Sequence, residues 1–334
     1  MKLYLIQNMI SAKHQKLSDR IQKERGCKRS SARVYSSNLS RIHREFLSDT
    51  KYSQDLKWLK SNDRKLLTKL KKIDNLNTQR NLLAAALVGF DLLKATSARE
   101  PYVEQIAVLN EKQKNTPADR TPKQQAKYVD WNKIIKLRRL LTRTVRLGKY
   151  YSRKKLLRRE FQALQQNLVL HLYTEIPPVR NDWSTVRFMT SSQWDDLTED
   201  EKKSSNILVL GRGAYHVYWA DYKTVKKHGV IQQVIPKQLQ SLLKKHIKFL
   251  KLHFPDNDHL LLGSTGTPMT RNGLTKFLQR LFYTHFRTKT STSALRSIFL
   301  THKFDKKQLD EQATVAKAMH HTTDVARQFY VKNK

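Results

Sequence analysis

The sequence is poor in the residues that stabilise secreted, metal-bound or membrane-embedded folds. Its 334 residues include one cysteine, Cys27, which excludes an internal disulfide and a zinc site built on cysteines. No run approaches the roughly 18 apolar residues of a membrane-spanning helix. The N-terminal residues MKLYLIQNMISAK lack the long apolar region and the small-residue cleavage site of a signal peptide. We therefore expect an intracellular protein that does not contact a membrane.

Acidic residues are also scarce. The chain has 28 Asp and Glu against 65 Lys and Arg, a formal net charge of +37 and a pI near 10.3. This excess is far beyond what solubility requires and predicts a polyanionic partner. Because the basic residues are spread along nearly the whole length, they favour an extended contact with nucleic acid over a single basic tail. The exception is WDDLTEDEKKSSN, residues 194–206, which we expect on a face turned away from the nucleic acid.

The chain is long enough for two domains, each with its own core. Residues 1–30 are polar and basic and predict an arm or a short helix. Residues 31–110 carry apolar side chains at helical spacing and predict a small helical bundle. The apolar segment QRNLLAAALVGFDLL suits its centre, where Gly89 indicates close helix packing because glycine lowers helix propensity. Residues 111–125 lack periodicity, contain two prolines and predict a linker; a surface loop within one domain is the alternative.

Residues 126–334 predict a second, mostly helical domain with one small sheet. Apolar residues from Trp131 to Val145 and from Leu157 to Leu168 mark two helices. Three segments rich in β-branched and aromatic residues follow: NILVLGR, AYHVYWADYK and GVIQQVIP. Turns at Arg212-Gly213 and His228-Gly229 separate them, which predicts a three-stranded antiparallel sheet. The expected fold class is mainly α (α+β).

Three residues suited to phosphate chemistry stand in order near the C-terminus: Arg296, His321 and Tyr330. A tyrosine oxygen can attack a phosphodiester while cationic donors hold the phosphate oxygens. If residues 323–331 are helical, Tyr330 lies about two and a half turns beyond His321, and both side chains can line one cleft. For this pair alone, a structural interpretation is commoner than a catalytic one: His321 would be a capping or surface histidine, and Tyr330 an aromatic side chain that packs the C-terminal tail against the domain.

The segment nevertheless resembles the C-terminal active-site half of the tyrosine recombinases, the phage-type integrases. Upstream, LYTEIPPVRNDW ends a helix at two prolines and sets a fixed turn before Arg180, where that family has its first catalytic arginine. This Pro-Pro-Val-Arg form, followed by Asp182 and Trp183, looks most like the recombinases of giant DNA viruses and Crypton-type transposons. The resemblance spans about residues 128–334, and more loosely residues 31–110 as a core DNA-binding domain.

The resemblance implies a site-specific recombinase or integrase of a mobile element. Such an enzyme cuts and rejoins double-stranded DNA through a 3′-phosphotyrosyl intermediate, as a tetramer on DNA and without a metal or other cofactor. Tyr330 would be the nucleophile, and Arg180 and Arg296 would hold the phosphate oxygens. Lys223, expected at the end of the middle strand, would be the general acid. His321 would hydrogen-bond the phosphate or accept the tyrosine proton.

One position departs from the family pattern and keeps two alternatives open. The family usually reads His-x-x-Arg at the second arginine, whereas Ser293 stands there in this sequence. Serine donates a hydrogen bond but cannot act as a base near neutral pH, so either His321 covers that function, His320 beside it assists, or the enzyme is slower. A type IB topoisomerase, which also lacks this histidine, is the first alternative. A catalytically impaired basic DNA-binding protein is the second.

Clustered cations add candidate DNA contacts, although a solvated face explains them equally well. The candidates are Lys154, Lys155, Arg158, Arg159, Lys226 and Lys227, the last two also competing with Lys223 for its role. With these contacts we expect the protein to reside with DNA, in a nucleus, a nucleoid or a viral replication compartment.

Overall fold

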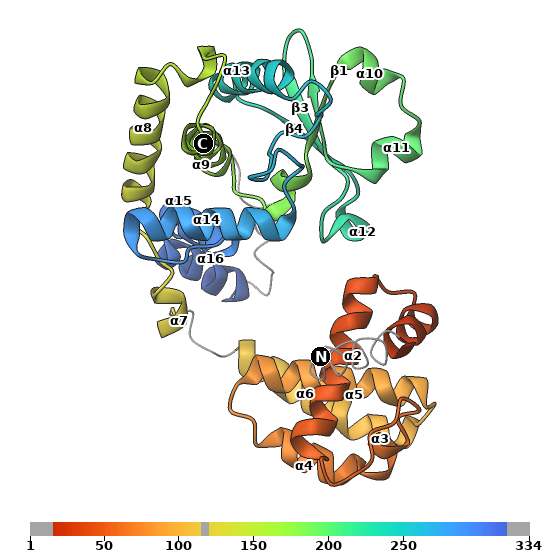
Figure 1. Ribbon diagram of the computed structural model, residues 1–334. Coiled ribbons are helices and arrows are strands. Elements are labelled where there is room, and N and C mark those ends of the chain that lie inside the picture. Colours follow the sequence, from red (N-terminus) through yellow and green to blue (C-terminus); the bar gives the residue numbers. More distant parts are fainter. Residues whose placement is uncertain (1–15, 115–119, 319–334) are drawn as a thin grey trace. The chain divides into compact units, whose positions relative to one another are not determined.

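The computed structural model describes residues 16–114 and 120–318 (Figure 1). The chain divides into two compact units, residues 1–119 and 120–334. His321 and Tyr330 lie outside the described residues.

The first unit is a helical bundle with one apolar core. Residues 16–25 are helical, and Leu17 and Ile21 are buried in the core, so this part of the predicted arm belongs to the bundle. The remaining helices are α2 (Arg29–Phe46), α3 (Lys57–Ser61), α4 (Asp63–Lys71), α5 (Leu76–Leu92) and α6 (Thr96–Lys114). The central helix is α5, and Asn75 caps it by accepting a hydrogen bond from the backbone N–H of Thr78.

Gly89 lies where α5 meets its neighbours most closely. A Cβ atom at this position would lie 2.4 Å from Cδ2 of Leu59 and 3.2 Å from Cδ2 of Leu39. Both leucines are fully buried, so neither can move aside into solvent. The close packing predicted from this glycine is confirmed.

The predicted linker is helical at both of its described ends. Helix α6 continues to Lys114, and α7 (Pro122–Gln125) begins the second unit. Thr121 starts α7 with a capping box: its hydroxyl accepts from the N–H of Gln124, and the Gln124 side chain accepts from the N–H of Thr121. Pro122 therefore does not prevent a helix at residues 122–125, because it stands at the first helical position, where its missing N–H is not needed.

The second unit packs helices and one sheet around a larger core. Its helices are α8 (Trp131–Leu147), α9 (Arg158–Thr174), α10 (Ser191–Asp195), α11 (Glu199–Ser204), α12 (Val225–His228), α13 (Lys237–His253), α14 (Arg271–Phe286), α15 (Thr292–Lys303) and α16 (Lys306–Ala318), with 3₁₀ turns η1 (Tyr150–Ser152) and η2 (Asn181–Thr185). The sheet contains β1 (Arg187–Thr190), β2 (Ile207–Leu210), β3 (Tyr215–Trp219) and β4 (Ile231–Val234). The mainly α fold class is confirmed.

The sheet has four strands rather than the three predicted, in the order β1-β2-β3-β4. The predicted strands are β2, β3 and β4, which pair antiparallel. The additional strand, β1, pairs in parallel with β2, with Phe188 opposite Leu208. A parallel pair needs a crossover connection, and residues 191–206, which include α10 and α11, supply it.

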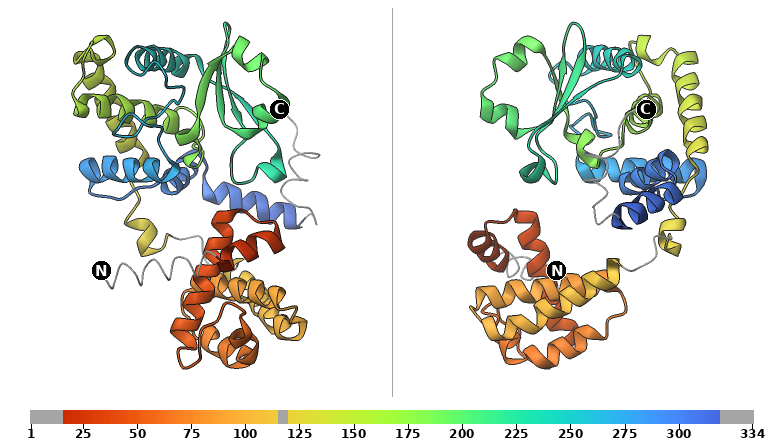
Figure 2. Two further views of the ribbon diagram at one scale, coloured as in Figure 1. Left: turned by 45° about the vertical axis from the view of Figure 1, so that its right-hand side comes forward. Right: turned by 180° about the vertical axis from the view of Figure 1, so that it is seen from behind.

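The two faces of the sheet meet different cores. Phe188, Leu208 and Val217 face the main core, which also contains residues of α9 and α13. Met189 and Val209, at alternating positions, face a small second cluster that Trp194 and Leu197 cover. Helices α10 and α11 therefore lie on the opposite face of the sheet from α9 and α13, as Figure 2 also shows.

We predict that Gly89→Leu lowers the free energy of unfolding of the first unit by about 1–3 kcal/mol, because added carbon atoms would overpack the contact with Leu39 and Leu59. Urea denaturation followed by circular dichroism measures the change. Glu104→Leu, which places the same side chain on the exposed surface of α6, is the matched control and should change stability by less than about 0.5 kcal/mol. Equal effects of the two substitutions would contradict the packing explanation.

Candidate active site

Two of the arginines predicted from the sequence line one pocket of the second unit. The pocket has a volume of about 360 Å³ and receives Arg180 from the segment before η2 and Arg296 from α15. Its other lining residues are Pro178, Val179, Asp182, Trp219, Tyr222, Thr224, His228 and Ile231. The fold thus brings together two cationic side chains that are far apart in the sequence.

Arg180 is placed by the abrupt end of α9. The helix stops at Thr174, and Pro177 and Pro178 carry the chain away from the helical path. Tyr173, fully buried at the end of α9, donates a hydrogen bond of 2.5 Å from its hydroxyl to the backbone oxygen of Arg180. Burial raises the pKa of Tyr173 well above its usual value, and the positive charge of Arg296 partly opposes this shift. The phenol is therefore a neutral anchor beside the pocket.

Asn181 fixes the segment of Arg180 to the helix that carries Arg296. Its Oδ1 accepts a hydrogen bond of 2.7 Å from the hydroxyl of Thr292, in the first turn of α15. Its Nδ2 donates a bond of 2.8 Å to the hydroxyl of Thr275 on α14. Because Thr292 and Arg296 are four residues apart, they share one face of α15. Asn181 therefore sets the relative position of the two arginines.

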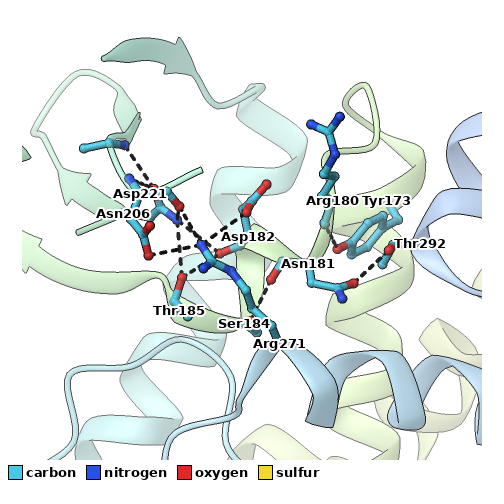
Figure 3. Close-up of polar contacts among 11 residues, drawn as sticks. Tyr173, Arg180, Asn181, Asp182, Ser184, Thr185, Asn206, Asp221, Arg271 and Thr292 are labelled. Carbon is cyan, nitrogen blue, oxygen red and sulfur yellow. Dashed lines mark hydrogen bonds and ion pairs between the residues drawn. The ribbon is translucent and has the colours of Figure 1, made fainter. Parts of the chain in front are cut away.

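A third arginine, Arg271, neutralises the carboxylates next to the pocket. Its Nη2 lies 3.4 Å from Oδ1 of Asp182 and 3.1 Å from Oδ2 of Asp221, and it donates to the backbone oxygen of Asp221 at 2.7 Å. Burial raises the pKa of Asp182, while the charges of Arg271 and Arg180 act in the opposite direction. Figure 3 shows the side chain of Arg180 pointing away from Arg271 and Asp221.

The guanidinium groups of Arg180 and Arg296 remain available. No ion pair or side-chain hydrogen bond joins either group to another residue within the ranges 16–114 and 120–318. Both side chains are partly buried, so an anion held between them is partly shielded from water. Planar guanidinium groups hold phosphate or carboxylate oxygens in pairs. The pocket is chemically suited to a phosphate group.

Asn206 is a structural centre of the site that the sequence did not reveal. Its side chain is fully buried; Oδ1 accepts from the N–H groups of Ala220 (3.0 Å) and Asp221 (2.9 Å). Its Nδ2 donates to the backbone oxygen of Asp221 (2.9 Å) and to the hydroxyl of Thr185 (3.3 Å). These bonds join η2, which follows Arg180, to the chain leaving β3. The only sequence signal was a polar residue directly before a buried apolar strand.

Lys223 lies beyond the strand to which the sequence assigned it. Strand β3 ends at Trp219, and Lys223 is in the loop that leads to α12. Its neighbours Tyr222 and Thr224 line the pocket, whereas the side chain of Lys223 is exposed and does not. Tyr222 closes this loop by donating a 2.7 Å hydrogen bond from its hydroxyl to the backbone oxygen of Gly229. Lys223 is thus beside the pocket, on a loop rather than a strand end.

The remaining candidates divide between the pocket rim and the surface. Ser293 is exposed on α15 and does not line the pocket, whereas His228, interpreted from the sequence as part of a turn, does. The six predicted DNA contacts Lys154, Lys155, Arg158, Arg159, Lys226 and Lys227 are all exposed. Among the residues that the structure describes, no group of three or more His, Cys, Asp or Glu could hold a metal ion, and no helix could cross a membrane.

We predict that Asn206→Ala lowers the free energy of unfolding of the second unit by about 3 kcal/mol, because it leaves the buried N–H group of Ala220 and the partly buried N–H group of Asp221 without acceptors. Asn206→Asp should also destabilise, since it places a further carboxylate among Asp182 and Asp221. Urea denaturation measures both, with the exposed Ser204→Ala as control. A change below about 1 kcal/mol for Asn206→Ala would show that these hydrogen bonds do not hold the site together.

The comparisons with known proteins give structural neighbours only. No family model and no curated protein matches the sequence. The XerH site-specific recombinase bound to palindromic difH substrate, in a post-cleavage complex, is 16% identical with a TM-score of 0.47, over 96% of this chain and 82% of that chain. The pre-cleavage XerH complex with difH is 16% identical with a TM-score of 0.44, over 96% of this chain and 81% of that chain. The XerA recombinase is 11% identical with a TM-score of 0.32, over 97% of this chain and 95% of that chain. The structural neighbours of this chain are tyrosine recombinases.

Proposed function

We propose that this protein is a site-specific DNA recombinase or integrase that cuts and rejoins double-stranded DNA through a 3′-phosphotyrosyl intermediate. The observation that carries the proposal is the pocket in which Arg180 and Arg296 present available guanidinium groups. The net charge of +37 supports DNA as the partner. Tyr330, which follows Arg296 in the sequence, is the nucleophile.

The reaction exchanges one phosphate ester for another. The hydroxyl oxygen of Tyr330 forms a bond to phosphorus while the bond from phosphorus to the 5′ oxygen breaks. His321 accepts the tyrosine proton, and Lys223 donates a proton to the departing 5′ oxygen. Because the phosphodiester is retained as a phosphotyrosine, a 5′ hydroxyl can reverse the step and reseal the strand. No external energy source is required.

The arginine pair supplies the stabilisation that this exchange needs. Negative charge builds on the non-bridging phosphate oxygens in the transition state, and two positioned guanidinium groups can hold those oxygens throughout. Asn181 contributes by keeping both arginines in place before DNA arrives, so little reorganisation accompanies the reaction. Arg271 contributes indirectly because it neutralises Asp182 and leaves Arg180 for the phosphate.

DNA contacts outside the pocket follow from the exposed cations. Lys154, Lys155, Arg158 and Arg159 lie between η1 and the first turn of α9, and Lys226 and Lys227 lie on α12 near the pocket. Each would meet the phosphate backbone and supply affinity without reading sequence. Recombination needs two paired sites, so we propose that the protein assembles on DNA as a tetramer.

We predict that Tyr330→Phe removes covalent attachment to DNA but leaves DNA affinity nearly unchanged. The phenol oxygen is the nucleophile, whereas affinity comes from many phosphate contacts. Incubation with a nicked suicide substrate followed by denaturing electrophoresis measures the adduct, and a gel shift measures affinity. A covalent adduct formed by the Phe variant would show that another residue is the nucleophile.

We predict that Arg180→Lys and Arg296→Lys each lower the cleavage rate about 100- to 1000-fold, because an ammonium group cannot reproduce the paired hydrogen bonds of a guanidinium. Arg187→Lys is the matched control: Arg187 is engaged with Asp258 on the surface and should retain near wild-type cleavage. Single-turnover cleavage of the suicide substrate measures all three. A near wild-type rate for Arg180→Lys would contradict its assigned role.

A further inference from the structure

A second concave surface, which we call the basic groove, lies on the second unit between α8, η1, α9 and α13. It has a volume of about 660 Å³ and shares no lining residue with the arginine pocket. Five apolar or aromatic residues form part of its lining: Val145, Tyr151, Leu242, Phe249 and Leu252. Four cations also line it: Arg146, Lys149, Lys245 and Lys248. None of its lining residues is acidic.

The combination of apolar residues and cations favours a protein occupant over DNA. All four cations are exposed, and none forms an ion pair with another residue of the described ranges. Leu252 is 70% exposed at the edge of the groove. A phosphate backbone would satisfy the cations but leave the exposed side chain of Leu252 in water. An acidic protein segment pairs with the cations, and the carbon atoms of its side chains can cover Leu252.

The chain itself contains a segment of this chemistry. Five acidic residues fall within the seven positions 195–201, which we call the acidic segment: Asp195, Asp196, Glu199, Asp200 and Glu201. All five are exposed. Glu201 caps α11 through Thr198, and Glu199 pairs with Lys202, whereas Asp195, Asp196 and Asp200 have no ion pair with another described residue. In a chain of net charge +37, this concentration of free carboxylates complements the basic groove.

The acidic segment cannot reach the groove of its own chain. Trp194 and Leu197 hold it on the second face of the sheet, and Trp194 stacks on Tyr218 with ring centroids 4.2 Å apart. The groove is formed by helices that belong to the opposite side (Figure 2). Contact between the two surfaces therefore requires two copies of the chain.

We propose that the basic groove of one copy binds the acidic segment of a second copy. Such a contact joins two different surfaces, so each copy keeps a free groove or a free acidic segment for a further copy, and the contact can close into a ring. The strong positive charge of the chain opposes this contact in solution, whereas DNA neutralises that charge and brings copies together. The contact does not depend on the chemistry of the arginine pocket.

Site-directed crosslinking on plasmid DNA tests the contact. In full-length protein carrying Cys27→Ser, one variant receives Ser152→Cys in the groove and another receives Ser192→Cys on α10, so that every charge is retained. The two variants are mixed on DNA and treated with a short bismaleimide. We expect the dimer yield to exceed, by roughly tenfold, that of the matched pair Ser297→Cys with Ser192→Cys, since Ser297 is exposed on α15, a helix that does not line the groove. Equal yields overturn the proposal.

Charge reversal then tests the chemistry of the contact. Lys245→Glu with Lys248→Glu in the groove copy should lower the dimer yield roughly tenfold, because like charges then face each other. The control Lys244→Glu with Lys251→Glu makes the same charge change on the same helix outside the groove and should have little effect. Asp195→Lys with Asp196→Lys in the second copy should restore the yield with the groove variant. Absence of this restoration overturns the proposal.

The same variants separate this contact from DNA binding and from catalysis. The groove and control charge reversals should weaken plasmid binding equally; a much larger loss for the groove variant would make the groove a DNA contact and overturn the proposal. Covalent adduct formation on a single nicked substrate should be equal in the two charge-reversed variants, so failure of the proposed catalytic function would be seen independently.

Discussion

The architecture of the candidate site depends on how one buried carboxylate is neutralised. Asp182 is only 7% exposed and follows Arg180 closely, so the nearest available cation in the sequence is the very arginine that the pocket needs. A buried charge is costly unless it is paired. Arg271, at the start of α14, pairs with Asp182 and also holds the chain at Asp221. Because Arg271 pairs with Asp182, the guanidinium group of Arg180 remains available for a ligand.

Most helices of the fold could be predicted because their apolar residues recur at the helical period and become buried together. The bundle around α5 and the helices α8, α9 and α13 follow this rule, whereas the strands β2 to β4 were marked by β-branched and aromatic residues between turn signals. Strand β1 could not be predicted in the same way. It has only four residues. It pairs in parallel with β2 across a crossover connection, so no hairpin turn beside it in the sequence indicates a strand.

The two arginines could be predicted from the sequence because a proline turn and a resemblance marked their positions. Their supports could not, since Asn181 and Asn206 act through hydrogen bonds to residues distant in sequence, such as Thr292 and Ala220. A lone asparagine carries no periodic signal that would reveal such partners. Lys223 was assigned to a strand end because the aromatic and β-branched segment AYHVYWADYK runs up to it, whereas Asn206 accepts from the N–H groups of Ala220 and Asp221 and ends the pairing.

The loop that carries Lys223 is held at both ends, by Asn206 at Asp221 and by Tyr222 at Gly229. The backbone of this loop is therefore held in place, and its mobile part is the long exposed side chain of Lys223. Exposed side chains change rotamer in picoseconds to nanoseconds, whereas loops and lids rearrange far more slowly. In its proposed role as proton donor, Lys223 could sample the pocket many times during the residence of a phosphate. Its access is then governed by rotamer populations, without any opening or closing of the protein.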